Sequence, residues 1–464
     1  MSQSKAQTQG SYIQGTDRFA PKDNYKSLSL NDSIEQALRK NFDEKSRQFQ
    51  SDILDLNWSD TKDDFWMPKI QLTLSSGEQR VGRLRRGSKT TNGADRLPGG
   101  YLALSLGEYT LFNWGKDYLA YLNEKEAYRR DSDSIKEKRR ELKHLIVSKY
   151  FQLYYYNRVL SINKTYLRHA SFVYRLNREK VTQKKISRQE YYQSRSQYLK
   201  AQNIYHEAKN NLKVANEEMA NLLDDPSGTQ YILADELNYK KVKITKYEAS
   251  TMAKESNPGI LDAKANVAIA KREYEITVKN NLPLPKFSIN LGAYQRTFGQ
   301  NVNSTAYSTR AGNSDLDIVA TVNATWSITG SGGLFNKRTT NRSHIEKQLF
   351  FNKLAQSQHT TESNVELRLK NLKHFENQIT ILEARNVTLQ KTFDVVLENY
   401  LNKKTRYLDF ENTLEDLIDS DIEFEKFRFL HVNEKVELAK EIGIEDFPGE
   451  NFESLGKSVT GDNS

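Results

Sequence analysis

The chain of 464 residues contains no cysteine, and this absence limits the chemistry that is open to it. Disulfide bonds, a thiolate nucleophile, a cysteine-based zinc site and a cysteine-linked lipid anchor are all excluded. Histidine is scarce as well, with seven residues in the chain. They show neither an HExxH motif nor the close spacing of metal ligands. We therefore expect ordinary packing and surface roles for the histidines, with no metal and no cofactor.

Long apolar runs are also missing. No stretch of about 18 or more apolar residues occurs, which excludes a transmembrane helix but leaves insertion by β-strands open. The N-terminal sequence MSQSKA lacks the apolar core of a signal peptide. This is compatible with a cytoplasmic protein, or with a mature chain in which a starting Met replaces the signal peptide. We expect the second, for a reason given below.

Proline is rare, and the stretches 99–225 and 286–447 contain none, so long helices are permitted there. The mean hydropathy of −0.77, with 37% hydrophobic residues, is low for a globular enzyme of this length and favours thin, elongated helical packing. The net charge of +9 arises from a mixture of both signs that makes up 28% of the chain. Such a mixture is typical of solvated helix faces, and we expect no nucleic-acid partner.

The chain repeats one pattern in its two halves. The segment Phe65–Leu74 returns as Pro283–Leu291, with the order apolar, Pro, Lys, apolar, polar, apolar in both copies. Each copy is followed by the sequence Leu-Phe-Asn, at 111–113 and at 334–336. The period is too long for a solenoid, so the repeat predicts two homologous halves that each hold a mixed helix and strand unit.

Apolar residues at every second position predict two short strands in each half. The connections 76–100 and 297–315 are rich in Gly, Asn and Ser, which indicates long exposed loops. The four predicted strands are Ile70–Leu74, Leu102–Leu106, Phe287–Leu291 and Ile318–Trp326.

Long helices are predicted on either side of these strands. A first helix begins at Ser29, with Asn31 or Asp32 as its cap, and a polar helix follows to about Asp64. The roughly 65 residues from Gly115 to Val181 would reach about 100 Å as one helix, so the chain must turn back, and we expect turns at 182–187 and 402–405. The predicted coiled-coil seams are Ile146, Leu153, Leu160, Leu167, Tyr174 and Val181 in the first half, and Leu372, Phe375, Ile379, Leu382, Asn386, Leu389, Phe393, Val396 and Tyr400 in the second.

These elements predict a division of the chain into nine segments. They are an N-terminal extension 1–28, a first-repeat helix 29–66, strands one and two at 67–107, a first helical hairpin 108–224 with its tip near 182–190, a connection 225–245, a second-repeat helix 246–283, strands three and four at 284–328, a second hairpin 329–444 with its tip near 400–409, and a C-terminal tail 445–464.

The duplicated order of helix, strand, loop, strand and long helical hairpin resembles the TolC-like outer-membrane efflux proteins, or outer membrane factors, over residues 29–444. The opening Leu30–Asn41 is similar to the family's first helix, and Asn257-Pro258 is similar to its second-repeat counterpart. Both predicted turns resemble the family pattern x-[IV]-[ST]-x-x-[DE]-[LV], at Lys185–Tyr191 and Lys404–Phe410. The order and spacing of these features carry the resemblance together.

The resemblance implies a mainly α protein with a transmembrane β part. Three chains would form a twelve-stranded β-barrel in outer-membrane lipid, continued by a long periplasmic α-helical barrel. Independently, four strands of about eight to ten residues match a tilted membrane strand but are too few to close a barrel in one chain. Outer-membrane placement requires a signal peptide, which is why we read Met1 as a replacement start.

The implied function is a passive export duct without catalysis or cofactor, energised by an inner-membrane transporter that is reached through a periplasmic adaptor. Two alternatives stay open from the sequence. One is a type I protein-secretion outlet of the same fold. The other is a cytoplasmic coiled-coil scaffold that uses the strands as a small interaction domain.

The resemblance places a gate at the periplasmic tip. Tyr400 matches the family's inward tyrosine, Glu190 its acidic partner on the first hairpin, and Asp409 an acidic residue of the constriction. Thr405 stands where some members have a latching Arg, and Asn412 where a second acidic ring can occur. The alternative for both acids is helix capping after a turn.

Other candidate residues face partners outside the chain. Lys184 and Lys403 replace turn glycines that in the family often take part in adaptor docking, which puts the standard docking mode in doubt. The aromatic residues Tyr101, Tyr109, Tyr294, Tyr307 and Trp326 are expected to be interfacial girdles, with core packing as the alternative. A basic loop is expected to pair with lipopolysaccharide phosphates, or to be merely soluble; its residues are Arg80, Arg83, Arg85, Arg86, Lys89 and Arg96.

Overall fold

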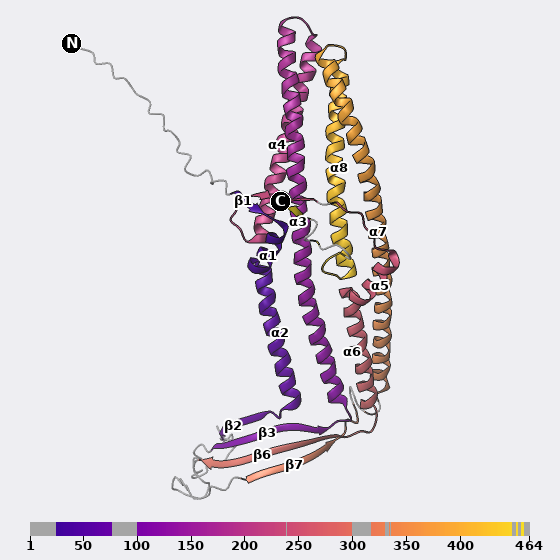
Figure 1. Cartoon of the computed structure of the whole chain (residues 1–464). Helices are drawn as coiled ribbons and strands as arrows, with labels where there is room; N and C mark the ends of the chain where they lie inside the picture. Colours follow the sequence, from indigo (N-terminus) through magenta and orange to yellow (C-terminus); the bar gives the residue numbers. More distant parts are fainter. Residues whose placement is uncertain are drawn as a thin grey trace, which may run out of the picture.

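The protein is elongated, with long helices side by side, a sheet of strands at one end and two hairpin turns at the other (Figure 1). This computed structural model describes residues 25–76, 100–237, 239–298, 317–329, 334, 336–447, 452 and 456–458. The expected mainly helical class is confirmed. No helix in these ranges combines the length and hydropathy that crossing a bilayer requires.

Two similar series of elements follow one another along the chain. The helices are α1 (Leu30–Lys40), α2 (Phe42–Trp66), α3 (Lys116–Thr182), α4 (Arg188–Leu223), α5 (Lys246–Ser256), α6 (Pro258–Asn280), α7 (Lys337–Leu401) and α8 (Tyr407–Ile442). The strands are β1 (Tyr25–Leu28), β2 (Ile70–Ser76), β3 (Gly100–Phe112), β4 (Gln230–Leu233), β5 (Asp235–Leu237), β6 (Lys286–Phe298), β7 (Asp317–Thr325) and β8 (Gly456–Ser458).

The four strands at the end of the molecule form one antiparallel sheet in the order β2-β3-β6-β7. Its register opposes apolar to apolar positions, with Leu72 opposite Leu104 and Ile289 opposite Val322. β3 is longer than the predicted strand because it continues through Leu111 and Phe112. Among the described strands, β2 and β7 each lack a neighbour on their outer side, so the sheet has two open edges.

In front of each strand pair the chain forms two helices in succession. Asn41 separates α1 from α2, and Asn257 separates α5 from α6. Each asparagine leaves helical geometry, and its side-chain oxygen caps the next helix, at 2.9 Å from the Asp43 nitrogen and 3.0 Å from the Ile260 nitrogen. The duplicated Asn therefore marks a bend and not a helix interior.

The N-terminal cap of α1 also differs from the prediction. Ser29, and neither Asn31 nor Asp32, is the cap, because its extended backbone lets the hydroxyl accept a hydrogen bond from the Asp32 nitrogen at 3.1 Å. Thr245 does the same for α5, where Glu248 completes a capping box. The two predicted candidates lie within the first turn of α1, past the position at which a cap acts.

The coiled-coil seams agree with the prediction in one half only. In α7, the buried seam residues include Leu372, Ile379, Leu382, Phe393 and Tyr400. In α3, Ile146 and Leu153 are buried, but towards the turn the predicted Leu167 and Tyr174 are only partly buried, and this part of the prediction was wrong. The buried positions there are Tyr166, Ala170, Val173 and Asn177, of which Tyr166 and Val173 each lie one residue before a predicted one. One residue rotates a helix face by about 100°, so the seam of α3 faces a different direction there.

Two cores fill the helical part. A broad core near the middle joins α1, α3, α4, α5, α7 and α8 with β1, β4 and β5. It also includes Phe447 and Phe452 from the predicted C-terminal tail, and β8 pairs with β5, so these described residues of the tail pack against the body. A second, narrower core lies nearer the turns and involves α3, α4, α7 and α8 alone.

Candidate functional site at the hairpin turns

The turns that join α3 to α4 and α7 to α8 lie at the end of the molecule opposite the sheet (Figure 1). In the first, Lys184 adopts a left-handed φ of 55°, and the Lys185 nitrogen donates to the Lys180 carbonyl at 2.9 Å. In the second, Lys403 has a φ of 60°, and the Lys404 nitrogen donates to the Asn399 carbonyl at 2.8 Å. Both are Schellman-type helix ends, a geometry that usually selects glycine at the left-handed position.

Tyr400 joins the second hairpin to the first. The side chain is 3% exposed, and its hydroxyl oxygen lies 2.7 Å from Asn177 Oδ1 on α3 and 3.4 Å from Glu190 Oε1 on α4. The ring stacks on Phe410, with 5.2 Å between ring centres. Burial raises the pKa of Tyr400, the Asn177 hydrogen bond opposes that shift and the charge of Glu190 adds to it, so the phenol stays protonated and can donate.

Lys180 completes this cluster, which we call the tip latch: Asn177, Lys180, Glu190 and Tyr400. The Lys180 Nζ lies 5.2 Å from the centre of the Tyr400 ring, within the range of a cation–π interaction. Burial lowers the pKa of Lys180, Glu190 opposes this shift and the nearby Lys403 adds to it. The structure thus brings together the predicted pair Glu190 and Tyr400, and adds two residues that the sequence did not indicate.

The alternative role of Glu190 and Asp409, capping of the helix after each turn, can be examined for each acid in turn. Ser187 caps α4, because its hydroxyl accepts a hydrogen bond from the Glu190 nitrogen at 3.1 Å, while the Glu190 carboxylate reaches towards Tyr400. Asp409 lies exposed in the first turn of α8 and, among the described residues, makes no side-chain hydrogen bond or ion pair. Thr405 is half-buried in the turn, and Asn412 is exposed one turn further along α8.

A second polar network, deeper in the bundle, was not predicted. Gln197 on α4 donates to the Tyr166 hydroxyl at 2.6 Å and also contacts Glu415 on α8. Lys200 donates to the same Glu415 carboxylate at 2.6 Å. Burial would raise the pKa of Glu415, but the hydrogen bonds from Lys200 and Gln197 lower it below its usual range. Tyr166 lies next to the predicted seam residue Leu167, and no seam was predicted for the helix that carries Gln197, so no sequence pattern pointed to this network.

The remaining predicted residues are placed as follows. Lys184 and Lys403 are exposed at the turns. Trp326 is 51% exposed and Tyr109 is half-buried, close to the ends of their strands. The positions outside the described residues or side chains are Tyr101, Tyr294, Tyr307, Arg80, Arg83, Arg85, Arg86, Lys89 and Arg96.

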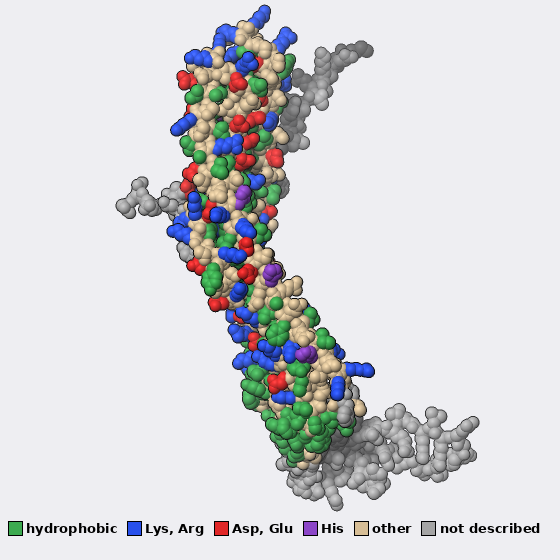
Figure 2. Space-filling view, turned by 90° about the vertical axis from the view of Figure 1, so that its right-hand side faces the viewer, with side chains coloured by type: hydrophobic (Ala, Val, Ile, Leu, Met, Phe, Trp, Pro, Cys, Tyr) green, Lys and Arg blue, Asp and Glu red, His purple; other side chains and the backbone are tan. Residues whose placement is uncertain are grey.

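Aromatic rings gather where α2 and α3 approach the sheet. Tyr121 stacks on Phe65 at 4.6 Å and on Trp58 at 5.5 Å between ring centres, and Trp66 and Tyr118 extend the cluster. Trp66 is 60% exposed. Figure 2 shows hydrophobic side chains collected at this end of the molecule, whereas Lys and Arg side chains protrude at the opposite end. The two ends therefore offer surfaces of different chemistry.

The long helices pack in a row with two open edges. Near the turns the packing order is α4-α3-α8-α7, and near the sheet it is α2-α3-α6-α7. The outer helices carry large apolar side chains that are more than half exposed in the single chain. On α2 these are Phe42, Phe49, Ile53 and Leu56; on α7 they include Ile345, Leu367, Ile381 and Val395.

Comparison with known proteins adds the fold relationship. No protein-family model matches the sequence. No curated protein matches it at a significant level. Among solved structures, CusC aligns with a TM-score of 0.74 and 16% identity over 89% of this chain and 92% of its own. The Campylobacter jejuni outer-membrane channel CmeC has a TM-score of 0.73 and 16% identity, over 92% and 88%.

A third solved structure, the open state of the Neisseria gonorrhoeae MtrE outer-membrane channel, has a TM-score of 0.70 and 13% identity over 90% of this chain and 89% of its own. Identities this low show the fold alone. The resemblance to TolC-like outer-membrane channels that the sequence predicted is confirmed at that level.

Proposed function

We propose that the chain is one subunit of a homotrimeric outer-membrane exit duct. Three copies close a twelve-stranded β-barrel and a long α-helical barrel, and substrates pass without catalysis from a periplasmic adaptor and an inner-membrane transporter to the exterior. The observation that carries this proposal is the pair of open edges, which occurs in the sheet and in the helical row alike.

The two layers have their open edges at matching places in the chain. β2 directly follows α2, and β7 leads into α7, so each edge of the sheet continues into an edge of the helical row. One rotation that brings β7 and α7 of one copy against β2 and α2 of the next therefore closes both layers. Closure also pairs strand edges that lipid would not tolerate.

The solved structures support the choice of an outer-membrane duct. CmeC and MtrE are described as outer-membrane channels, and CusC is described in terms of transmembrane channel formation. At 67 residues, α3 is about 100 Å long, which carries the turns far from the sheet. In this proposal the aromatic cluster on α2 and α3 lies at the membrane interface, and the turns lie deep in the periplasm.

The tip latch serves as the gate of the duct in this proposal. It holds α7 against α3 and α4 through a phenolic hydrogen bond that is hidden from water, so its loss frees one hairpin to move relative to the other. Asp409 is proposed to form the constriction. Three copies of an exposed carboxylate around one axis would favour cations.

The test is the oligomeric state of the purified chain and its dependence on the α2 edge. The wild-type chain should extract as a trimer that requires detergent, whereas Leu56→Arg, which places a charge on the edge, should yield monomers. Leu145→Arg is the matched control, because Leu145 is 43% exposed on α3, inside the helical row, and should leave the trimer intact. A detergent-free soluble dimer, or equal behaviour of the two variants, would contradict the proposal.

A further inference from the structure

Six basic side chains crowd the two turns, and we call them the basic crown: Lys184, Lys185 and Arg188 at the first turn, Lys403, Lys404 and Arg406 at the second. All six are exposed, and within the described part of the chain none of their side chains forms an ion pair or hydrogen bond. Some exposed lysines on the helix shafts do pair, as Lys246 does with Glu366 at 2.6 Å. The crown differs in gathering six unpaired basic side chains at two turns that lie at the same end of the molecule.

The charge of the crown is not neutralised by its surroundings. Residues 178–190 and 398–409 together contain eight basic and four acidic side chains. One of the four acids, Glu190, is committed to Tyr400 in the tip latch. In Figure 2 the basic side chains protrude from this end into open solvent.

The backbone at the crown adds an independent observation. Lys184 and Lys403 are two of four non-glycine residues with a positive φ in the described ranges. A side chain in this region costs about 1–2 kcal/mol, which glycine avoids. The chain does use glycine elsewhere, at Gly443 after α8, where φ is 86°. Lysine at both strained turn positions therefore lowers the stability of the fold relative to glycine. The positive charge is the property of lysine that glycine lacks, and it explains why lysine is present there.

Apolar side chains lie next to the crown. Tyr192 is 59% exposed, Leu401 44% and Leu408 53%, each within a few residues of the turn lysines or arginines. A small apolar patch surrounded by charge is the usual composition of a protein-binding surface. A purely solubilising charge would not need these exposed apolar residues beside it.

We infer that the basic crown docks a protein whose own docking loops are acidic. This inference rests on the proposed function, in which the partner is the periplasmic adaptor, and it adds the chemistry by which that partner is selected. Complementary charge around an apolar contact speeds association, fixes the register and excludes partners with basic loops. It also makes docking sensitive to salt.

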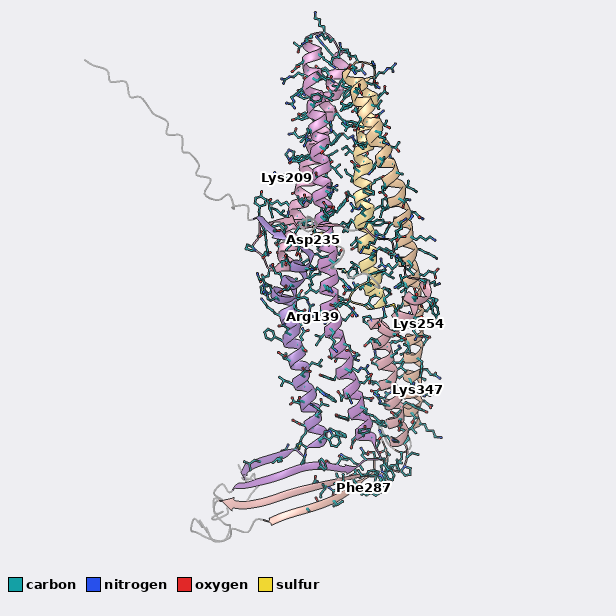
Figure 3. All side chains as sticks on the ribbon, viewed as in Figure 1. Arg139, Lys209, Asp235, Lys254, Phe287 and Lys347 are labelled. Atoms are coloured by element: carbon teal, nitrogen blue, oxygen red, sulfur yellow. The ribbon has the colours of Figure 1, made fainter. Side chains whose placement is uncertain are left out.

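The test uses a synthetic helical hairpin with glutamates at its turn, and a twin hairpin with glutamines there. The informative variant is Lys184→Gly with Lys403→Gly, because it removes charge while relieving the strained backbone, so a folding defect is not expected. The control is Lys164→Gln with Lys209→Gln, two exposed shaft lysines without ion pairs in the described chain; Figure 3 labels Lys209 well away from the turns. Binding is measured on the detergent-solubilised full chain at low and high salt.

We expect the glutamate hairpin to bind the wild-type chain and the shaft control alike, and to bind the glycine variant about fivefold or more weakly. Binding should weaken as salt rises, and the glutamine twin should bind poorly. Equal binding of both hairpins, or equal binding to all variants, overturns the inference. Crown-dependent binding to phosphatidylglycerol vesicles with no hairpin binding also overturns it, because the partner would then be anionic lipid.

Channel recordings on the same preparation separate this inference from the proposed function. Channels without hairpin binding refute the role of the crown and leave the duct standing. Hairpin binding without channels supports acidic-partner docking but refutes the duct.

Discussion

The middle of the molecule and its turn end are built from the same long helices, yet they are held together differently. In the middle, three small strands and the C-terminal segment join the helices, and Lys143 contacts both Glu445 and Asp446 at 3.3 Å. Near the turns, four helices meet without any such strap, and the links between hairpins depend on a few polar groups around Tyr400 and Glu415. We call the strapped middle the collar, and we expect the turn end to change shape more readily than the collar.

The strongest test of the difference between the middle and the turn end is to make the same Leu→Ala substitution in the core of each region. Leu223 in the middle and Leu414 near the turns are 0% and 1% exposed. Leu223→Ala should lower the free energy of unfolding of the whole chain by about 2–5 kcal/mol. Leu414→Ala should cost less globally, because the turn end can open locally, and its effect should appear as faster amide exchange confined to that end. Equal losses in the global free energy of unfolding, without locally faster amide exchange, would show that the two regions are equally stable.

The strand end gives the next largest effect. Arg at Leu72 or Val322, which are 69% and 66% exposed in the single chain, should cost about 2–4 kcal/mol if these positions face the membrane midplane. Arg at Thr73 or Asn290, on the alternate positions, should be tolerated and change conductance. The measurement is folding into detergent micelles or bilayers. Equal defects in both sets would mean that the strand faces are assigned wrongly.

Acid should weaken the turn end more than the collar. The folded-state pKa of Glu415 is lowered, so its contribution to stability is present above the unfolded-state pKa and is lost as the pH falls through the folded-state value. We expect amide exchange in α4 and α8 near Gln197 to increase below about pH 4.5. Glu415→Gln should remove much of this dependence. A wild-type pH profile in that variant would assign the effect to other carboxylates.

The smallest effect is expected from Asp409, the residue proposed to form the constriction. Asp409→Asn should reduce cation selectivity and block by divalent ions without changing the stability of the chain, because the side chain is exposed and makes no hydrogen bond or ion pair among the described residues. Asn412→Asp is the converse variant, since it adds an acid one turn along α8 and should strengthen selectivity. Reversal potentials in asymmetric salt provide the measurement. Unchanged selectivity in both variants would remove Asp409 from the constriction.

The elements that could be predicted from the sequence are those with local, repeated patterns. Period-two runs predicted the strands, and the turn motifs, interpreted through the family resemblance, predicted the pairing of Glu190 with Tyr400. The sequence indicated a first helix near 29–41 followed by a polar helix, whereas the break at Asn257, inside the predicted second-repeat helix 246–283, carries no apolar signal. The starts of α1 and α5 do have a local sequence pattern, a serine or threonine cap followed by an acid three residues later, at Ser29 and Thr245.

Contacts between distant segments could not be predicted in the same way. Gln197, Glu415 and Lys200 come together only because α4 and α8 both pack against α3. The shifted seam of α3 has a similar cause, since this helix packs against several neighbours and its buried face is wider than one heptad stripe. The residues buried on such a helix are determined by its neighbours in the tertiary structure, and the apolar pattern of one helix does not reveal those neighbours.

The most direct test of the account is single-channel conductance in a planar bilayer for wild-type chain and for Glu190→Gln combined with Tyr400→Phe. Tyr192→Phe, at an exposed tyrosine of the same end, is the control. Each lost hydrogen bond contributes about 0.5–1.5 kcal/mol, so removing the latch should shift the gate severalfold towards open. We expect larger conductance steps for the double variant and wild-type steps for the control. Wild-type conductance in the double variant would contradict a gate at the turns.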